Sequence, residues 1–263
     1  MAKTVTLPIK NGEVEIVRFG QGNKSFVILP GLSYDGFFEA AEEIERAYAA
    51  FAKDYTVYLV DRNKWPHEGY TVEEIADDTA EVFEQLKIEK ADAFGASLGG
   101  MVAQALAIRH PKLVDRLVIG STLARPNETF LSVLSRWKSL AKVGKIEDLI
   151  TDFYHTIYCP ATLRQYAAAL DAARPIATEE KTRRFLIYVE AAKRFDSFDS
   201  LGRIKCKTLV VASRGDRVTT AEGAREIAEK LACDYYEYEN FGHAVFDEAP
   251  DYKERILDHF LRK

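Results

Sequence analysis

The feature of this sequence that most constrains its fold is the alternation of short strand-like runs with amphipathic helical stretches. Helices that connect strands in this way form right-handed βαβ units, whose strands pair in parallel and are covered on both faces. The strand-like runs, in sequence letters, are SFVILP, TVYLVD, ADAFGAS, VDRLVIGST, KTLVVAS and DYYEYEN. The pattern predicts an α/β fold with a mostly parallel central sheet of about eight strands, flanked by helices.

Two further strands precede the alternating part. The runs TVTLPI and EVEIVRFG are separated by Lys10-Asn11-Gly12, and Asn-Gly is a strong signal for a hairpin turn. We therefore expect antiparallel strands at one edge of the sheet. Thr71 and Glu74 stand at capping-box spacing at the start of one predicted helix. The helical spacing of apolar residues predicts helices at 36–52, 71–86, 98–110 and 250–263.

One segment of the chain contains no convincing strand. Its amphipathic stretches cover residues 128–142, 146–158, 161–173 and 178–195. Gly144 separates the first two stretches, and Pro160 and Pro175 punctuate the later ones. We interpret residues 124–201 as a helical insertion between two strands of a core made of residues 1–123 and 202–263.

Charge and composition exclude several classes of partner. The net charge of −5 gives no reason to expect a nucleic acid or an anionic membrane surface, and no apolar run is long enough to span a bilayer. The N-terminus shows no secretory signal, and the three cysteines form no C-x-x-C pair, so we expect a cytoplasmic protein with reduced thiols. Histidine and cysteine never cluster at ligand spacing, so no metal site is expected.

The strand ADAFGAS continues directly into a helix through Gly95-Ala96-Ser97-Leu98-Gly99, a G-x-S-x-G motif. In such a sharp strand-to-helix turn, a Cβ atom at either glycine would collide with the neighbouring strand or helix. The turn raises the Ser97 hydroxyl above the carboxyl ends of the strands, where parallel sheets bind their ligands. The motif predicts that Ser97 is a nucleophile; the alternative is that Ser97 merely caps the helix.

A serine nucleophile needs a base and an acid that orients the base. Of the five histidines, only His243 follows the last strand in a glycine-containing loop at the same sheet end as Ser97. Asp216 follows the strand KTLVVAS, again at the carboxyl end, whereas Asp247 and Glu248 are close to His243 in sequence and are expected to brace its loop. The chain order Ser97, Asp216, His243 is that of one hydrolase architecture.

The negative charge that develops during attack on a carbonyl needs backbone N–H donors. One follows from geometry: the N–H of Leu98, at the start of the helix after Ser97. The other is expected from the loop after SFVILP, where Gly31-Leu32-Ser33 would present the N–H of Leu32.

These segments resemble the α/β-hydrolase superfamily over nearly the whole chain outside the insertion. VILPGLSYDG is similar to its oxyanion loop, with Pro30 where many members have histidine, and FGASLGGMVAQALAIRHP is similar to its nucleophile elbow. LGRIKCKTLVVASRGDRV and FGHAVFDEAP are similar to the approaches to the acid and the histidine. The resemblance implies a triad of Ser97, Asp216 and His243, oxyanion donors at Leu32 and Leu98, and a helical cap at 124–201.

We therefore expect a cofactor-free serine hydrolase that cleaves a small or medium, partly apolar acyl compound, most commonly a carboxylic ester. Because Ser97 is not an aspartate, the dehalogenase and epoxide-hydrolase branches are disfavoured. The same triad could instead act on a carbon–carbon bond, thioester, lactone or peptide, or perform a lyase step, and a non-catalytic ligand receptor is a further alternative. A monomer and a homodimer both fit the sequence. Candidate pocket residues in the cap are Trp137, Phe153, Tyr154 and Tyr158.

Overall fold

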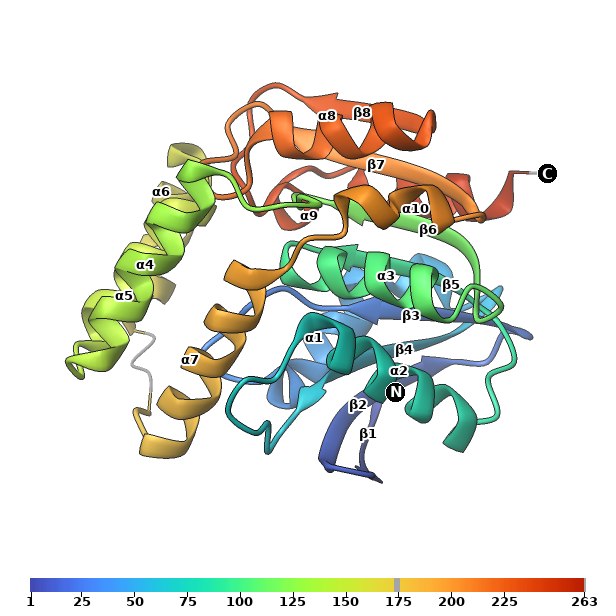
Figure 1. Ribbon diagram of the computed structural model, residues 1–263, viewed down its shortest axis with the longest axis horizontal. Coiled ribbons are helices and arrows are strands. Elements are labelled where there is room, and N and C mark those ends of the chain that lie inside the picture. The colour runs from blue at the N-terminus through green and yellow to red at the C-terminus, as the bar shows by residue number, and fades with distance from the viewer. Residues whose placement is uncertain (173–175, 263) are drawn as a thin grey trace.

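The computed structural model describes residues 1–172 and 176–262, and its centre is one eight-stranded sheet (Figure 1). The strand order is β1-β2-β4-β3-β5-β6-β7-β8. The strands are β1 (Lys3–Ile9), β2 (Gly12–Gly20), β3 (Lys24–Leu29), β4 (Tyr55–Asn63), β5 (Ala91–Ala96), β6 (Val114–Gly120), β7 (Lys207–Ser213) and β8 (Asp234–Tyr238).

The first three strands in sheet order pair antiparallel, and every later pair is parallel. β1 pairs with β2 around the Asn11-Gly12 turn, and β2 pairs antiparallel with β4. From β4 through β3, β5, β6, β7 and β8 the strands run in one direction. The predicted α/β fold, with an antiparallel hairpin at one edge, is confirmed. All carboxyl ends of the parallel strands therefore meet at one edge of the sheet.

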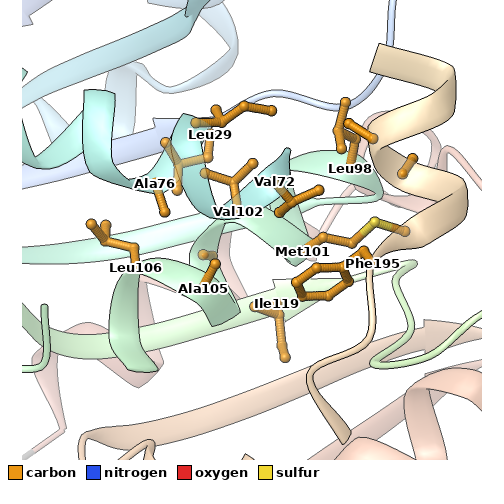
Figure 2. Close-up of a cluster of buried hydrophobic side chains, with 14 of the residues drawn as sticks. Leu29, Val72, Ala76, Leu98, Met101, Val102, Ala105, Leu106, Ile119 and Phe195 are labelled. Atoms are coloured by element: carbon orange, nitrogen blue, oxygen red, sulfur yellow. The ribbon is translucent and has the colours of Figure 1, made fainter. Parts of the chain in front are cut away.

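Helices cover both faces of the sheet, so its central strands are buried on both sides. Every residue of β4 and β5 is buried, as expected for central strands of a parallel sheet. Figure 2 shows one of the two faces, where Met101 and Val102 pack with Val72 over Leu29 and Ile119. The helices of the core are α1 (Ala41–Ala47), α2 (Val72–Gln85), α3 (Leu98–Arg109), α8 (Thr220–Leu231), α9 (Val245–Glu248) and α10 (Tyr252–Leu261).

The predicted helix over 36–52 is wrong as a single element. The segment consists of two short 3₁₀ helices, η1 (Phe38–Ala40) and η2 (Ala49–Phe51), on either side of α1. The α-helix ends at Ala47, and the next residue, Tyr48, leaves the helical region with φ and ψ of −112° and 20°. This break lets Phe51 turn into the core, where its ring stacks on Phe26 at a centroid distance of 4.6 Å.

Four helices lie between β6 and β7, at one side of the sheet in Figure 1. They match the four predicted amphipathic stretches to within a few residues. Residues 173 and 175, which end one stretch and separate it from the next, lie outside the described residues. The four helices, followed by η3 (Phe198–Arg203), are α4 (Glu128–Lys142), α5 (Ile146–Ile157), α6 (Pro160–Ala172) and α7 (Glu179–Arg194). The inserted helices are thus confirmed, and their division into a separate domain at 124–201 stays a prediction.

Within the described ranges, no helix combines the length and the apolar character needed to cross a bilayer. The helix with the most continuous burial, α3, runs only from Leu98 to Arg109 and packs on the sheet beside α2.

Asp92 is a buried carboxylate at the end of the sheet opposite Ser97, near the start of β5. It is 6% exposed and accepts a hydrogen bond from Tyr55 Oη at 2.7 Å, while its Oδ1 has no partner among the described residues. Burial raises the pKa of Asp92 to about 6. The folded state therefore holds this proton more tightly than the unfolded chain does. Protonated Asp92 contributes stability to the fold that is fully present below about pH 4 and is lost as the pH rises through 6.

We predict that Asp92→Asn raises the free energy of unfolding at pH 8 by about 1–3 kcal/mol, because asparagine keeps the Tyr55 contact without a buried charge. The gain should shrink towards zero near pH 4, as measured by urea unfolding across that range. Asp148→Asn, at an exposed carboxylate paired with Lys145, is the control and should change little at either pH. A gain for Asp92→Asn that does not depend on pH would contradict the prediction.

Candidate active site

Ser97 lies in the turn between β5 and α3, in a backbone conformation that side chains rarely adopt. Its φ and ψ are 56° and −122°. A Cβ atom on Gly95 would lie 2.1 Å from the carbonyl oxygen of Gly99, and one on Gly99 would lie 1.9 Å from that of Leu29. Neither position admits a side chain, so the two glycines of the motif allow α3 to start directly against β3 and β5.

The strained turn is held by hydrogen bonds to the next strand. The Ser97 N–H donates to the carbonyl of Gly120 at 3.0 Å, and Thr122 Oγ1 donates to the carbonyl of Ser97 at 2.9 Å. The Ser97 side chain is partly exposed at the carboxyl edge of the sheet, although the residues on both sides of it are buried. The fold thus presents one hydroxyl at that edge.

His243 and Asp216 come from the loops after β8 and β7, and the structure brings them into contact. Nδ1 of His243 lies 2.9 Å from both carboxylate oxygens of Asp216. The two loops approach so closely that Gly215 cannot carry a side chain, since a Cβ atom there would lie 2.3 Å from the carbonyl oxygen of Phe241. Both side chains are buried, with His243 4% and Asp216 6% exposed. The pairing leaves Nε2 as the free ring nitrogen.

Asp216 is an ionised carboxylate despite its burial. Burial by itself raises the pKa of this carboxyl, but the facing His243 imidazole and the hydrogen bonds from its neighbours outweigh it, so the pKa lies below its ordinary range. Those neighbours are the N–H groups of Val218 at 2.8 Å and Thr219 at 3.0 Å, and Thr219 Oγ1 at 2.7 Å. An anion fixed in this way holds a proton on the Nδ1 of His243.

Ser97 and His243 line one cavity beneath the inserted helices. No hydrogen bond joins the two side chains in the described part of the chain, and such contacts are often long in structures without a substrate. The cavity has a volume of about 50 Å³. Its walls come from α3, α4, α5, α7, α9 and the loops after the strands: Gly31, Leu32, Ser97, Leu98, Met101, Phe130, Leu134, Trp137, Phe153, Ile157, Ala192, Val218, His243 and Phe246.

Two of the four predicted pocket residues, Trp137 and Phe153, line this cavity. Their rings are 4.6 Å apart, and Trp137 Nε1 donates to Asp152 Oδ2 at 2.8 Å, which fixes the indole in place. Tyr154 and Tyr158 do not line the cavity.

Tyr154 and Tyr158 lie on another face of α5, where they stack on each other at 6.0 Å and Tyr158 approaches Tyr166 of α6. The phase of the helix explains the difference, since Phe153 and Ile157 share one stripe and the tyrosines occupy the next. Sequence reasoning missed other apolar residues of the cavity wall, among them Phe130 and Leu134. The spacing of Phe130, Leu134 and Trp137 along α4 could have indicated them.

The two residues predicted to supply oxyanion donors, Leu32 and Leu98, line the same cavity as Ser97. Leu98 is the first residue of α3. Leu32 follows Gly31, and a Cβ atom on Gly31 would lie only 3.3 Å from Ser97 Cβ. Neither the Leu32 nor the Leu98 N–H has an acceptor among the described residues, so both could donate to a group that enters the cavity. Two N–H donors are what an oxyanion site needs, and the assignment of Leu32 and Leu98 to one stays a prediction.

The other histidines lie elsewhere. His67 contacts Glu74 at 2.8 Å, and His110 contacts Asp77 at 2.8 Å. Glu248 braces the histidine loop as expected, because its Oε2 accepts the Gly242 N–H.

A family model described as alpha/beta hydrolase fold matches residues 24–250, which contain all the residues of the cavity. The chain belongs to the α/β-hydrolase fold family. This α/β hydrolase is 26% identical over 254 residues to a protein of Rhizobium rhizogenes named carbamate hydrolase RutD, covering 91% of this chain and 93% of that one. It is 21% identical over 255 residues to a 3-oxoadipate enol-lactonase of Acinetobacter baylyi, covering 93% and 91%.

The fold of this α/β hydrolase is also that of solved structures. The enol-lactonase from Burkholderia xenovorans superimposes with a TM-score of 0.86 at 20% identity, covering 98% of this chain and 100% of that one. MGS-M2, an alpha/beta hydrolase enzyme from a deep-sea metagenome, gives the same TM-score, with 98% of each chain covered.

The backbone strain at Ser97 can be measured. We predict that Ser97→Gly is more stable to unfolding than Ser97→Ala by about 1–2 kcal/mol, because only glycine relieves the positive φ, while both variants lack the hydroxyl. At Ser132, exposed in the interior of α4, the order should be reversed, with glycine less stable than alanine by about 1 kcal/mol. Urea unfolding of the two pairs checks this, and the same order at both sites would contradict it.

Proposed function

We propose that this protein is a serine hydrolase in which Ser97, His243 and Asp216 act as a catalytic triad on the carbonyl group of a small acyl compound. The observation that carries the proposal is the contact of His243 Nδ1 with the buried Asp216 carboxylate, at 2.9 Å, beside a cavity that Ser97 also lines. This is the geometry that a general base needs, with one ring nitrogen fixed by an acid and the other free.

In the proposed reaction, Ser97 Oγ attacks the carbonyl carbon while His243 Nε2 takes the hydroxyl proton. The backbone N–H groups of Leu32 and Leu98 bind the oxyanion of the tetrahedral intermediate. His243 then gives its proton to the leaving group, and an acyl-enzyme remains on Ser97. Water, deprotonated by the same imidazole, releases the acid and restores the serine. Asp216 stays ionised throughout and stabilises the imidazolium.

The lining of the cavity supports a small and uncharged acyl group. Apart from His243, none of its residues carries an ionisable side chain, and its volume of about 50 Å³ holds only a few water-sized groups. A short carboxylic ester fits this site. The names of the relatives, a carbamate hydrolase and an enol-lactonase, support the carbonyl chemistry, because carbamates, lactones and esters all present a carbonyl carbon to the nucleophile. A lactone, which is a cyclic ester, is therefore the second candidate.

We predict that the protein hydrolyses p-nitrophenyl acetate and butyrate faster than the octanoate, since the longer chain exceeds the cavity. Ser97→Ala and His243→Gln should each lower the rate by about a thousandfold or more, because the nucleophile and its base act as one unit. Release of p-nitrophenol, measured beside thermal unfolding, checks both statements.

His67→Gln serves as the control, because His67 is an exposed histidine outside the cavity and should leave the rate unchanged. Full turnover by a folded Ser97→Ala variant would overturn the proposed mechanism. A panel that adds a γ-lactone and a phenyl carbamate then distinguishes the ester from the other carbonyl substrates.

A further inference from the structure

Arg62 is a buried arginine at the end of β4 that contacts the loop carrying Gly31 and Leu32. Its side chain is only 7% exposed, and Nε has no hydrogen-bond partner among the described residues. Burying a guanidinium with an unsatisfied N–H is unfavourable. Such a residue therefore needs contacts that compensate for its desolvation, and those contacts lie on this loop.

The guanidinium holds the loop through three hydrogen bonds from its two terminal nitrogens. Nη1 donates to the carbonyl oxygen of Gly31 and, at 3.3 Å, to that of Pro30. Nη2 donates to Ser33 Oγ, also at 3.3 Å. The rings of Phe37, just before η1, and of Tyr188 in α7 lie 5.9 and 5.2 Å from the guanidinium carbon, and these contacts confine the side chain on two sides. Arg62 therefore fixes the conformation of the loop immediately before and after Leu32.

The charge of Arg62 is balanced by Asp61, but the ion pair does not account for the loop contacts. Nη2 lies 3.3 Å from Asp61 Oδ1. That carboxylate also accepts the backbone N–H groups of Arg62 at 2.8 Å and Phe37 at 3.3 Å. Asp61 is thus held by the backbone independently of the guanidinium, whereas the Gly31 carbonyl receives its hydrogen bond from Arg62.

The contact with the Gly31 carbonyl matters because that oxygen and the Leu32 N–H belong to the same planar peptide group. A donor that fixes the direction of the carbonyl also fixes the direction of the N–H on the opposite side. A cationic donor further draws electron density from the peptide, so the N–H becomes a stronger donor. A Cβ atom on Gly31 would lie 3.3 Å from Ser97 Cβ, and Gly31, Leu32 and Ser97 line the same cavity, so this peptide lies beside the proposed nucleophile.

We propose that Arg62 is a positioning residue that orients and polarises the Gly31–Leu32 peptide, so that the Leu32 N–H binds the developing oxyanion. The inference rests on the proposed function for its catalytic consequence. Its structural part, the polarised Leu32 amide, stands on the contacts of Arg62 alone.

The test compares Arg62→Met, Arg62→Lys and Asp61→Asn with the wild type. Arg62→Met should lower kcat for p-nitrophenyl butyrate by about 10–100-fold, somewhat less than complete loss of an oxyanion donor, with KM changed less than about threefold. Arg62→Lys keeps the positive charge but has only one nitrogen to donate from, so its kcat should lie between those of Arg62→Met and the wild type. Asp61→Asn keeps the contact with Gly31 and should stay within about threefold of the wild-type kcat.

Two further readouts separate positioning from a general structural effect. Butylboronic acid, which forms a tetrahedral adduct on a serine, should lose affinity for Arg62→Met in proportion to the loss of kcat. In protein labelled with ¹⁵N-leucine, the Leu32 amide proton should move upfield in Arg62→Met and not in Asp61→Asn, because the peptide is less polarised. If Arg62→Met does not fold, the double variant Asp61→Asn/Arg62→Met, which removes both charges, replaces it in every measurement.

The outcomes for the two proposals are distinct. A wild type that cleaves no ester, but whose Leu32 resonance shifts in Arg62→Met, overturns the proposed function and supports the positioning of the peptide by Arg62. An active wild type whose kcat and Leu32 resonance are both retained in a folded Arg62→Met variant overturns the role of Arg62 and leaves the proposed function in place.

Discussion

The close approach of α3 to β3 and β5 is the constraint on which the rest of the site depends. Backbone meets backbone there, and no side chain fits at Gly95 or Gly99. The approach forces Ser97 into a positive φ, and in return it places one hydroxyl and the free amide of Leu98 at the same point of the sheet edge. The unfavourable conformation is tolerated because the surrounding sheet and helix are buried and hydrogen-bonded on all sides.

The inserted helices are part of the site and are attached to both loops that carry its polar side chains. At the end of α5, the Ile157 carbonyl accepts the N–H of Ala244 at 2.9 Å, next to His243, and the Tyr158 carbonyl accepts Arg217 at 3.2 Å, next to Asp216. Glu248 joins the same region to the histidine loop, since it accepts the Cys159 N–H at 2.7 Å. The end of α5 therefore fixes the cavity wall and the two loops relative to one another.

Much of the fold and of the candidate site could be predicted from the sequence, because both follow from local patterns. The alternation of strands and helices gives the sheet, and the carboxyl ends of β5, β7 and β8 bring Ser97, Asp216 and His243 to one edge. The division of residues 36–52 into η1, α1 and η2 could not be predicted, because the packing of Phe51 against Phe26 overrides the helical periodicity of the segment.

Other parts of the site depend on tertiary contacts that leave little signal in the sequence. Phe153 and Tyr154 are adjacent aromatics, and only the packing of α5 decides which of them faces the cavity. In the sequence, Arg62 directly follows the run TVYLVD, and its contact with Gly31 depends on where β4 lies beside β3. Residues that act through the backbone of another segment are therefore visible only once the sheet is assembled.

The most direct test of the central claim, that the fold activates one serine, is covalent labelling with a fluorophosphonate probe followed by peptide mass spectrometry. The account predicts that the native protein takes up one equivalent of probe, attached to the peptide that contains Ser97, with loss of fluoride. Folded protein that stays unlabelled, or that carries the probe on another residue, would contradict it.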